Sequence, residues 1–131
     1  MSSERVVLRE GPFKRLINDG VTVGDWIYLS GQLSVDASGQ TVGENDIAEQ
    51  VRMAYQNVKT TLQGFGAEMH HVVEETLFVT DIRHFLSRAD ELFAIRAHAY
   101  GEEPQVAQTL VQVVALGVST SMIEIKCVAK V

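Results

Sequence analysis

The sequence of 131 residues lacks features that disulfide-bonded, zinc-binding and membrane proteins require. A single cysteine, Cys127, excludes an internal disulfide and a zinc site built from several cysteines. No apolar run approaches the roughly 20 residues of a membrane helix. Residues 1–10 carry four charged side chains in place of the long apolar stretch of a targeting segment. We therefore expect a cytoplasmic protein that does not interact with a membrane.

Positive charge is scarce. Lys and Arg number 11 against 17 Asp and Glu, which gives a formal net charge of −6. Nucleic acids and anionic membranes are bound through clustered cations, and the sequence has no basic stripe interleaved with aromatic residues. We expect no nucleic-acid partner.

The common catalytic motifs are also missing. Gly64 and Gly66 follow a helical pattern and resemble a helix end, not a phosphate-binding loop. No two histidines have the three- or four-residue spacing of a metal-binding helix face, and we expect the adjacent His70 and His71 to point apart. Cys127 alternates with apolar residues, which is typical of a buried core position. We expect no metal site and no cysteine nucleophile.

What is present is the pattern of one α+β domain over residues 1–131, with 46% apolar and 21% charged residues. Period-two and apolar runs predict strands at 6–8, 25–33, 72–80, 109–116 and 122–131, the last two joined across 117–121. Residues 36–39 predict a hairpin turn with a return strand at 40–42, while 13–23 is ambiguous. Spacings of three and four predict two helices at 46–65, capped by Asn45 or Asp46, and at 85–100. Both helices should lie on one face of the sheet.

The C-terminal strands are apolar on both faces. Leu110 and Val114 share one face of their strand, and Val111, Val113 and Ala115 share the other. A strand that is apolar on both faces needs cover on both, and two helices cover only one. We infer that a second subunit covers the other face.

Several segments together resemble the YjgF/RidA family of reactive intermediate deaminases. Residues 24–32, Gly-Asp-Trp-Ile-Tyr-Leu-Ser-Gly-Gln, resemble its Ser-Gly-Gln strand signature. Residues 50–59 resemble its long helix, with a Gln, an Asn-Val pair and a Lys, and residues 72–81, ending Phe-Val-Thr-Asp, resemble the following strand. Residues 111–113 and 123–125 resemble its paired C-terminal strands. The resemblance extends over about residues 20–130.

This resemblance implies a chorismate-mutase-like α+β fold, a homotrimer and ligand clefts between subunits. It also implies hydrolysis of reactive enamines and imines to keto acids and ammonia, without a cofactor. An imine carbon is already electrophilic, so the protein needs only to hold the substrate, orient a water molecule and supply a proton. The expected ligand is a small-molecule metabolite.

The family's charged site residues carry over only in part. Glu124 matches a glutamate on the last strand that orients water, and is the expected catalytic residue. Gln108 stands where the family has an arginine that grips the substrate carboxylate, and a neutral amide cannot replace that charged fork. Arg15 or Arg96 are the candidates to supply the missing charge from elsewhere.

The remaining expected ligand contacts are less polar. The family's N-terminal tyrosine aligns with Ile17 without a gap, or with Phe13 if Gly-Pro is matched, and neither has a hydroxyl. Backbone groups near Ser30, Gly31 and Leu110 are expected to contact the ligand. Two of the family's three polar anchors are therefore absent.

Two functions of different classes follow. The first is a deaminase for an imine, enamine or related reactive metabolite other than a simple 2-imino acid, because losing a charge-assisted pair costs a few kcal/mol. The second is a non-catalytic trimer that binds a small metabolite or a partner protein. A nuclease function, also a name attached to this family, disagrees with the net charge of −6.

Overall fold

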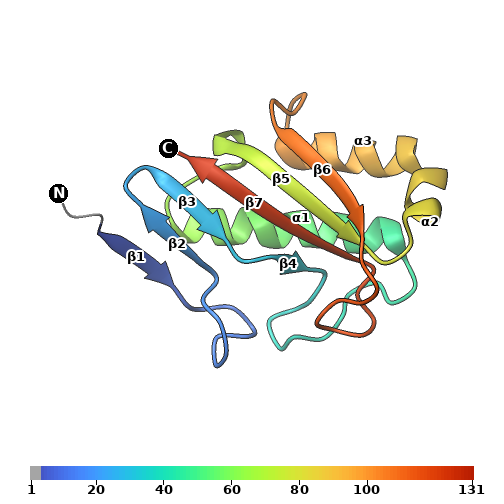
Figure 1. The fold of residues 1–131 in the computed structure, drawn as a ribbon, viewed down its shortest axis with the longest axis horizontal. Coiled ribbons are helices and arrows are strands. Elements are labelled where there is room, and N and C mark those ends of the chain that lie inside the picture. The colour runs from blue at the N-terminus through green and yellow to red at the C-terminus, as the bar shows by residue number, and fades with distance from the viewer. Residues whose placement is uncertain (1–3) are drawn as a thin grey trace.

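A computed structural model describes residues 4–131 as a seven-stranded mixed sheet with helices on one of its faces (Figure 1). The strands are β1 (Arg5–Leu8), β2 (Gly20–Val23), β3 (Trp26–Leu29), β4 (Gln32–Leu33), β5 (Val72–Val79), β6 (Ala107–Gln112) and β7 (Ile123–Lys130). The helices are α1 (Ile47–Gly64), the 3-10 turn η1 (Met69–His71), α2 (Ile82–Ser87) and α3 (Ala89–Tyr100). The expected α+β architecture is confirmed, with three α-helices in place of two.

The sheet is built around β7. Its strand order is β1-β2-β3-β7-β5-β6, and β4 pairs with β7 beside β3. All pairs are antiparallel except β5 and β6, which run parallel and are connected through α2 and α3. The prediction of neighbouring C-terminal strands is therefore wrong, because β5 lies between β6 and β7. Strand β6 is left at an edge of the sheet.

Helix α1 confirms the strongest sequence pattern. The Asp46 side chain caps it by accepting a hydrogen bond from the Glu49 backbone N–H, and Gly66 at φ 76° follows its end. Its buried face packs across the sheet (Figure 1) and is formed by Ile47, Gln50, Val51, Ala54, Tyr55, Val58 and Leu62. No helix within residues 4–131 is long and apolar enough to cross a membrane.

The second predicted helix is two helices. Asp81 caps α2 through the His84 backbone N–H, so helical structure begins before residue 85. Arg88, at φ −119° and ψ 24°, leaves the helical region and separates α2 from α3. Apolar spacing did not reveal this break, because α3 continues with helix-compatible residues on the other side of it.

Three strand predictions need correction. The strand predicted at 109–116 is β6, which begins two residues earlier and ends at Gln112, so Val113, Val114 and Ala115 lie beyond the strand. The run at 25–33 is interrupted at Ser30, whose backbone N–H and hydroxyl donate to the carbonyls of Asp19 and Asn18 instead of a strand partner. The hairpin turn at 36–39 is confirmed, with Gly39 at φ 85°, but its return strand is reduced to the single bridge Val35–Thr41.

Within residues 4–131 no helix covers the sheet face opposite α1 and α3. Alternation places Ile27 and Leu29 of β3 in the core and leaves Trp26 41% and Tyr28 43% exposed. On β6, Val111 is 36% exposed on the same face. Exposed aromatic and β-branched side chains along one sheet face are what the expected subunit interface requires.

Candidate functional site

The residues predicted for the site lie in two separate places within one chain. Phe13, Ile17, Ser30 and Gly31 line one cavity. Glu124 lies against Gly31 but is not one of the residues that line the cavity. Gln108 and Leu110 lie on the edge strand β6, and their register with β5 places them on the helix-covered side. The sheet therefore separates Gln108 from the carboxylate of Glu124.

Glu124 projects from β7 toward the open face of the sheet. It pairs across the strands with Phe78 on β5 and Leu33 on β4, between the buried residues Ile123 and Ile125. Burial raises the pKa of its carboxyl group, and the nearby Lys126 ammonium partly opposes this shift. Within residues 4–131 the carboxylate has no hydrogen-bond partner, so it is free to accept one from water.

Gly31 is needed where it is because the Glu124 carboxyl group packs against it. A Cβ built on Gly31 would lie 2.5 Å from Cδ and from Oε2 of Glu124. Any side chain at this position would displace the carboxyl group. The Ser-Gly step between β3 and β4 thus makes room for the predicted catalytic residue.

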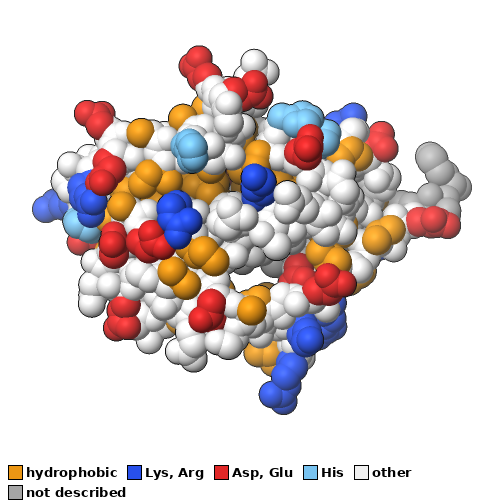
Figure 2. Space-filling model, turned by 180° about the vertical axis from the view of Figure 1, so that it is seen from behind, with side chains coloured by type: hydrophobic (Ala, Val, Ile, Leu, Met, Phe, Trp, Pro, Cys, Tyr) orange, Lys and Arg blue, Asp and Glu red, His pale blue; other side chains and the backbone are white. Residues whose placement is uncertain are grey.

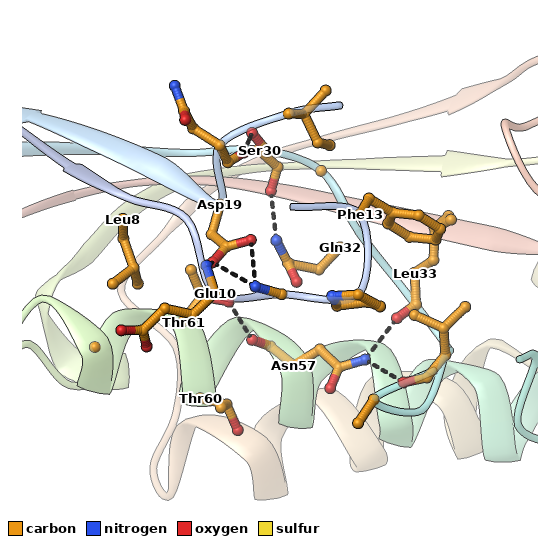
Figure 3. A pocket seen from close by; sticks show the side chains of 18 of the residues that line it. Leu8, Glu10, Phe13, Asp19, Ser30, Gln32, Leu33, Asn57, Thr60 and Thr61 are labelled. Carbon is orange, nitrogen blue, oxygen red and sulfur yellow. Dashed lines mark hydrogen bonds between the residues drawn. The ribbon is translucent and has the colours of Figure 1, made fainter. Parts of the chain in front are cut away.

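The cavity beside this step has a volume of about 350 Å³. It opens between α1 and the loop 10–19, where the space-filling view shows a hollow (Figure 2). Phe13 and Leu33 lie at one end of it and Leu8 at the other (Figure 3). A cavity of this size fits a small metabolite.

Side-chain hydrogen bonds hold the walls of this cavity. Asn57 of α1 donates to the carbonyls of Leu33 and Val35, at 2.8 and 2.9 Å. The Asp19 carboxylate accepts from the backbone N–H groups of Glu10 and Gly11 (Figure 3). The sequence did not reveal this cavity, because the loop 10–19 gave no periodic pattern and its contact with α1 is long-range.

Gln108 has a partner that the sequence analysis missed. Its side-chain Nε2 donates to Oε2 of Glu75 at 2.7 Å, and the strand register places Glu75 between Gln108 and Cys127. The other donors to Glu75 are Arg96 and two tyrosines, Tyr55 and Tyr100. The one sequence feature that could have indicated this contact is Glu75 itself, a charged residue within the otherwise apolar strand β5.

Of the two arginines considered as replacements for the family arginine, the structure places one beside Gln108. The Nε of Arg96 donates to the same Glu75 oxygen at 2.6 Å, and the Arg96 side chain is 14% exposed. Arg15 lies in the exposed loop between β1 and β2, away from β6. Leu110 is half-buried and packs against the core.

The cysteine and the adjacent histidines were the remaining candidates for a nucleophile or a metal ligand. Cys127 is fully buried, and burial raises the pKa of its thiol, which disfavours the thiolate. His70 and His71 do not point apart as expected: in the 3-10 turn their ring centroids lie 4.1 Å apart. Within residues 4–131, no three His, Cys, Asp or Glu side chains are grouped to hold a metal ion.

Comparisons with known proteins identify relatives of this chain. Residues 11–131 match the family model described as endoribonuclease L-PSP. The chain is 30% identical over 119 residues to the human 2-iminobutanoate/2-iminopropanoate deaminase, covering 91% of this chain and 80% of that protein. It is 31% identical over 119 residues to protein DfrA of Myxococcus xanthus, covering 91% and 85%.

A solved structure extends the similarity to the fold. A Mycobacterium tuberculosis member of the YjgF/YER057c/UK114 family superposes with a TM-score of 0.79 at 28% identity. The match covers 98% of this chain and all of that one.

Proposed function

Because this chain belongs to the YjgF/Rid family, whose model carries the description endoribonuclease L-PSP, we propose that it deaminates a small imine or enamine other than a simple 2-imino acid. The observation that carries the proposal is Glu124, a partly desolvated carboxylate that has no hydrogen-bond partner within residues 4–131 and packs against Gly31. The human relative is named for deamination of two 2-imino acids.

The substrate cleft is proposed to form between subunits of a homotrimer. Within one chain the sheet separates Gln108 from Glu124, so a cleft that uses both residues needs a second copy. The open sheet face, with Trp26, Tyr28 and Val111 exposed, supports such an interface. The edge position of β6 makes Gln108 available to a neighbouring subunit.

The proposed reaction is a hydrolysis in which Glu124 moves protons. Its carboxylate accepts a proton from a bound water molecule as the water oxygen bonds to the imine carbon. The carboxyl group then gives this proton to the nitrogen, which yields a carbinolamine. In a second transfer the carboxylate takes the proton of the carbinolamine hydroxyl and delivers it to the amino nitrogen, and the C–N bond breaks as the carbonyl forms. Ammonia leaves, and no oxidant or reductant is consumed. The desolvated position of Glu124 brings the pKa of this base closer to neutral pH.

The substrate is proposed to differ from a simple 2-imino acid because the family's carboxylate-gripping arginine is Gln108 here. A neutral amide does not offer a charged two-pronged donor. In addition, one Gln108 N–H is already donated to Glu75.

This proposal is tested by trapping imines with semicarbazide. An amino-acid oxidase generates 2-imino acids from acidic, aromatic and aliphatic precursors, and a flavin amine oxidase generates a neutral imine from benzylamine. We expect wild type to suppress semicarbazone formation from the neutral imine, and Gln108→Arg to suppress it from 2-imino acids. Equal suppression of all imines by wild type would contradict the proposed substrate class, and no suppression by either protein would contradict deamination.

A second candidate function is ligand binding without turnover. The donation from Gln108 to Glu75 favours it, since that amide N–H is not available to a substrate. A thermal-shift screen with neutral and acidic metabolites tests it. Stabilisation by a ligand that Glu124→Ala leaves unchanged, together with no imine hydrolysis, would favour binding over catalysis.

A further inference from the structure

The Glu75 carboxylate is the most densely hydrogen-bonded group in the described chain. Its Oε1 accepts from the hydroxyls of Tyr55 at 2.9 Å and Tyr100 at 2.7 Å. Its Oε2 accepts from Nε of Arg96 at 2.6 Å and Nε2 of Gln108 at 2.7 Å. A carboxylate has about four acceptor positions, and here all are filled. Glu75 is fully buried and holds the four side chains in fixed positions.

This cluster leaves unused hydrogen-bonding groups on Arg96 and Gln108. Arg96 uses its Nε, so the N–H groups on its two terminal nitrogens have no partner within residues 4–131. Gln108 uses Nε2, so its Oε1 has no donor there. Neither Oε1 nor the terminal nitrogens are among the buried unpaired atoms of the chain, so solvent reaches them. Arg96 Nε and Gln108 Nε2 bind one oxygen and therefore lie side by side.

The charge of Arg96 is balanced. Its guanidinium forms an ion pair with the buried Glu75 carboxylate, and Gln108 adds no charge. A ligand carboxylate placed on the terminal nitrogens would be attracted by Arg96 and repelled by Glu75 directly behind it. A neutral ligand group experiences no such repulsion. The cluster therefore favours a neutral group over an anion.

The pattern of the unused groups defines the ligand further. Arg96 offers N–H donors, and Gln108 offers a carbonyl acceptor beside them. The complementary group carries a carbonyl oxygen next to an N–H, as in a carboxamide or a ureido group. We propose that Arg96 and Gln108 form a donor–acceptor edge that binds a terminal carboxamide or ureido group of the substrate. Its place in the catalytic cleft rests on the proposed function.

The edge is fixed before the ligand arrives. The Arg96 guanidinium carbon lies 5.8 Å from the Phe93 ring centre and 5.5 Å from that of Tyr100. Together with the bond to Glu75, these contacts limit rotation of a long side chain that would otherwise lose entropy on binding. The amide orientation of Gln108 is set as well, because only its NH₂ end can donate to a carboxylate.

The test is a binding titration that does not depend on turnover. Butanamide, propylurea and butanoate are matched in size and are titrated into 15N-labelled wild type, Gln108→Leu and Gln108→Arg. In wild type we expect the amide and the urea to bind at least fivefold more tightly than butanoate and to shift the Gln108 side-chain NH₂ and Arg96 Nε resonances. Gln108→Leu keeps Arg96 but removes the acceptor, so only the amide and urea affinities fall. Gln108→Arg reverses the preference toward butanoate.

Three results would overturn this inference. They are equal or tighter binding of butanoate to wild type, resonance shifts confined to other residues, and no binding of any of the three compounds. Failure of the proposed function looks different. If the amide binds at Gln108 but Glu124→Gln does not slow imine hydrolysis, the deaminase mechanism fails and the binding edge stands. If imine hydrolysis depends on Glu124 but wild type does not bind the amide more tightly than butanoate, only the donor–acceptor edge is rejected.

Discussion

Two glutamates on neighbouring strands of this sheet have opposite environments. Glu75 of β5 faces the helices, is fully buried and accepts four hydrogen bonds. Glu124 of β7 faces the open side and has no hydrogen-bond partner in the described chain. Both are acidic side chains within apolar strands. Their environments differ because they point to opposite faces of the sheet.

This difference in hydrogen bonding indicates which of the two carboxylates can accept a proton from water. A carboxylate whose acceptor positions are all filled can neither hold a water molecule nor take its proton without breaking a protein hydrogen bond. A partly desolvated carboxylate without partners can do both. We therefore propose a positioning role for Glu75 and proton transfer for Glu124. The following substitutions test that division.

Removing Glu75 should have the largest effect on stability. Glu75→Ala leaves the Arg96 cation and two tyrosine hydroxyls without their shared acceptor, and breaking a buried ion pair costs about 3–5 kcal/mol. Urea unfolding measures this loss. Glu74→Ala, at the exposed neighbouring position, is the control and should change the free energy of unfolding by less than about 0.5 kcal/mol. Equal losses in both variants would contradict the positioning role.

A side chain at Gly31 should disturb Glu124 more than it disturbs the fold. Gly31→Ala puts a Cβ where the flexible end of Glu124 lies, so the carboxyl group moves while the backbone stays. We expect imine hydrolysis to fall about 100-fold, since a displacement of about 1 Å can cost that much. Gly117→Ala, where an added Cβ meets nothing within 4 Å, is the control. If both variants hydrolyse at the same rate, the placement of Glu124 does not matter.

Removing a single donor to Glu75 should have a smaller effect than removing Glu75 itself. Tyr100→Phe deletes one hydrogen bond to a buried carboxylate and should lower the free energy of unfolding by about 1.5–3 kcal/mol. Ser119→Ala is the control for the loss of a hydroxyl, because Ser119 is exposed in the loop between β6 and β7. An unchanged midpoint of denaturation for Tyr100→Phe would show that the hydrogen bond from the Tyr100 hydroxyl to Glu75 does not contribute to stability.

The smallest effect is the pH dependence of stability caused by Glu124. Its folded pKa is raised by burial, so the folded state binds this proton more tightly than the unfolded state does. The resulting destabilisation is absent below the ordinary value of 4.5 and complete once the pH exceeds the raised value. Glu124→Gln should therefore gain stability relative to wild type as pH rises through this window, as urea midpoints from pH 4 to 8 would measure. If the urea midpoint of Glu124→Gln instead fell relative to that of wild type as the pH rises, a raised pKa of Glu124 would be contradicted.

The sequence predicts some of these features and not others, for physical reasons. Helix α1 is evident because its apolar spacing and the Asp46 cap are local signals. Glu124 and Gly31 came from a family pattern that preserves their order along the chain. The contact of Gln108 with Glu75 was not predictable in this way, since it depends on the parallel register of β5 and β6, which are 33 residues apart at this pair. The break at Arg88 was missed because apolar spacing does not report backbone angles.

The central claim is that Glu124 does chemistry and Glu75 does not, and one paired measurement on Glu124→Gln tests it most directly. The rate of hydrolysis of the neutral imine and the free energy of unfolding are measured for this variant and for wild type. We predict a rate loss of at least about 100-fold, the usual contribution of a positioned acid–base group, with a stability change below about 1 kcal/mol. A variant that hydrolyses the imine at the wild-type rate, or that loses activity only in proportion to its unfolded fraction, would contradict the claim.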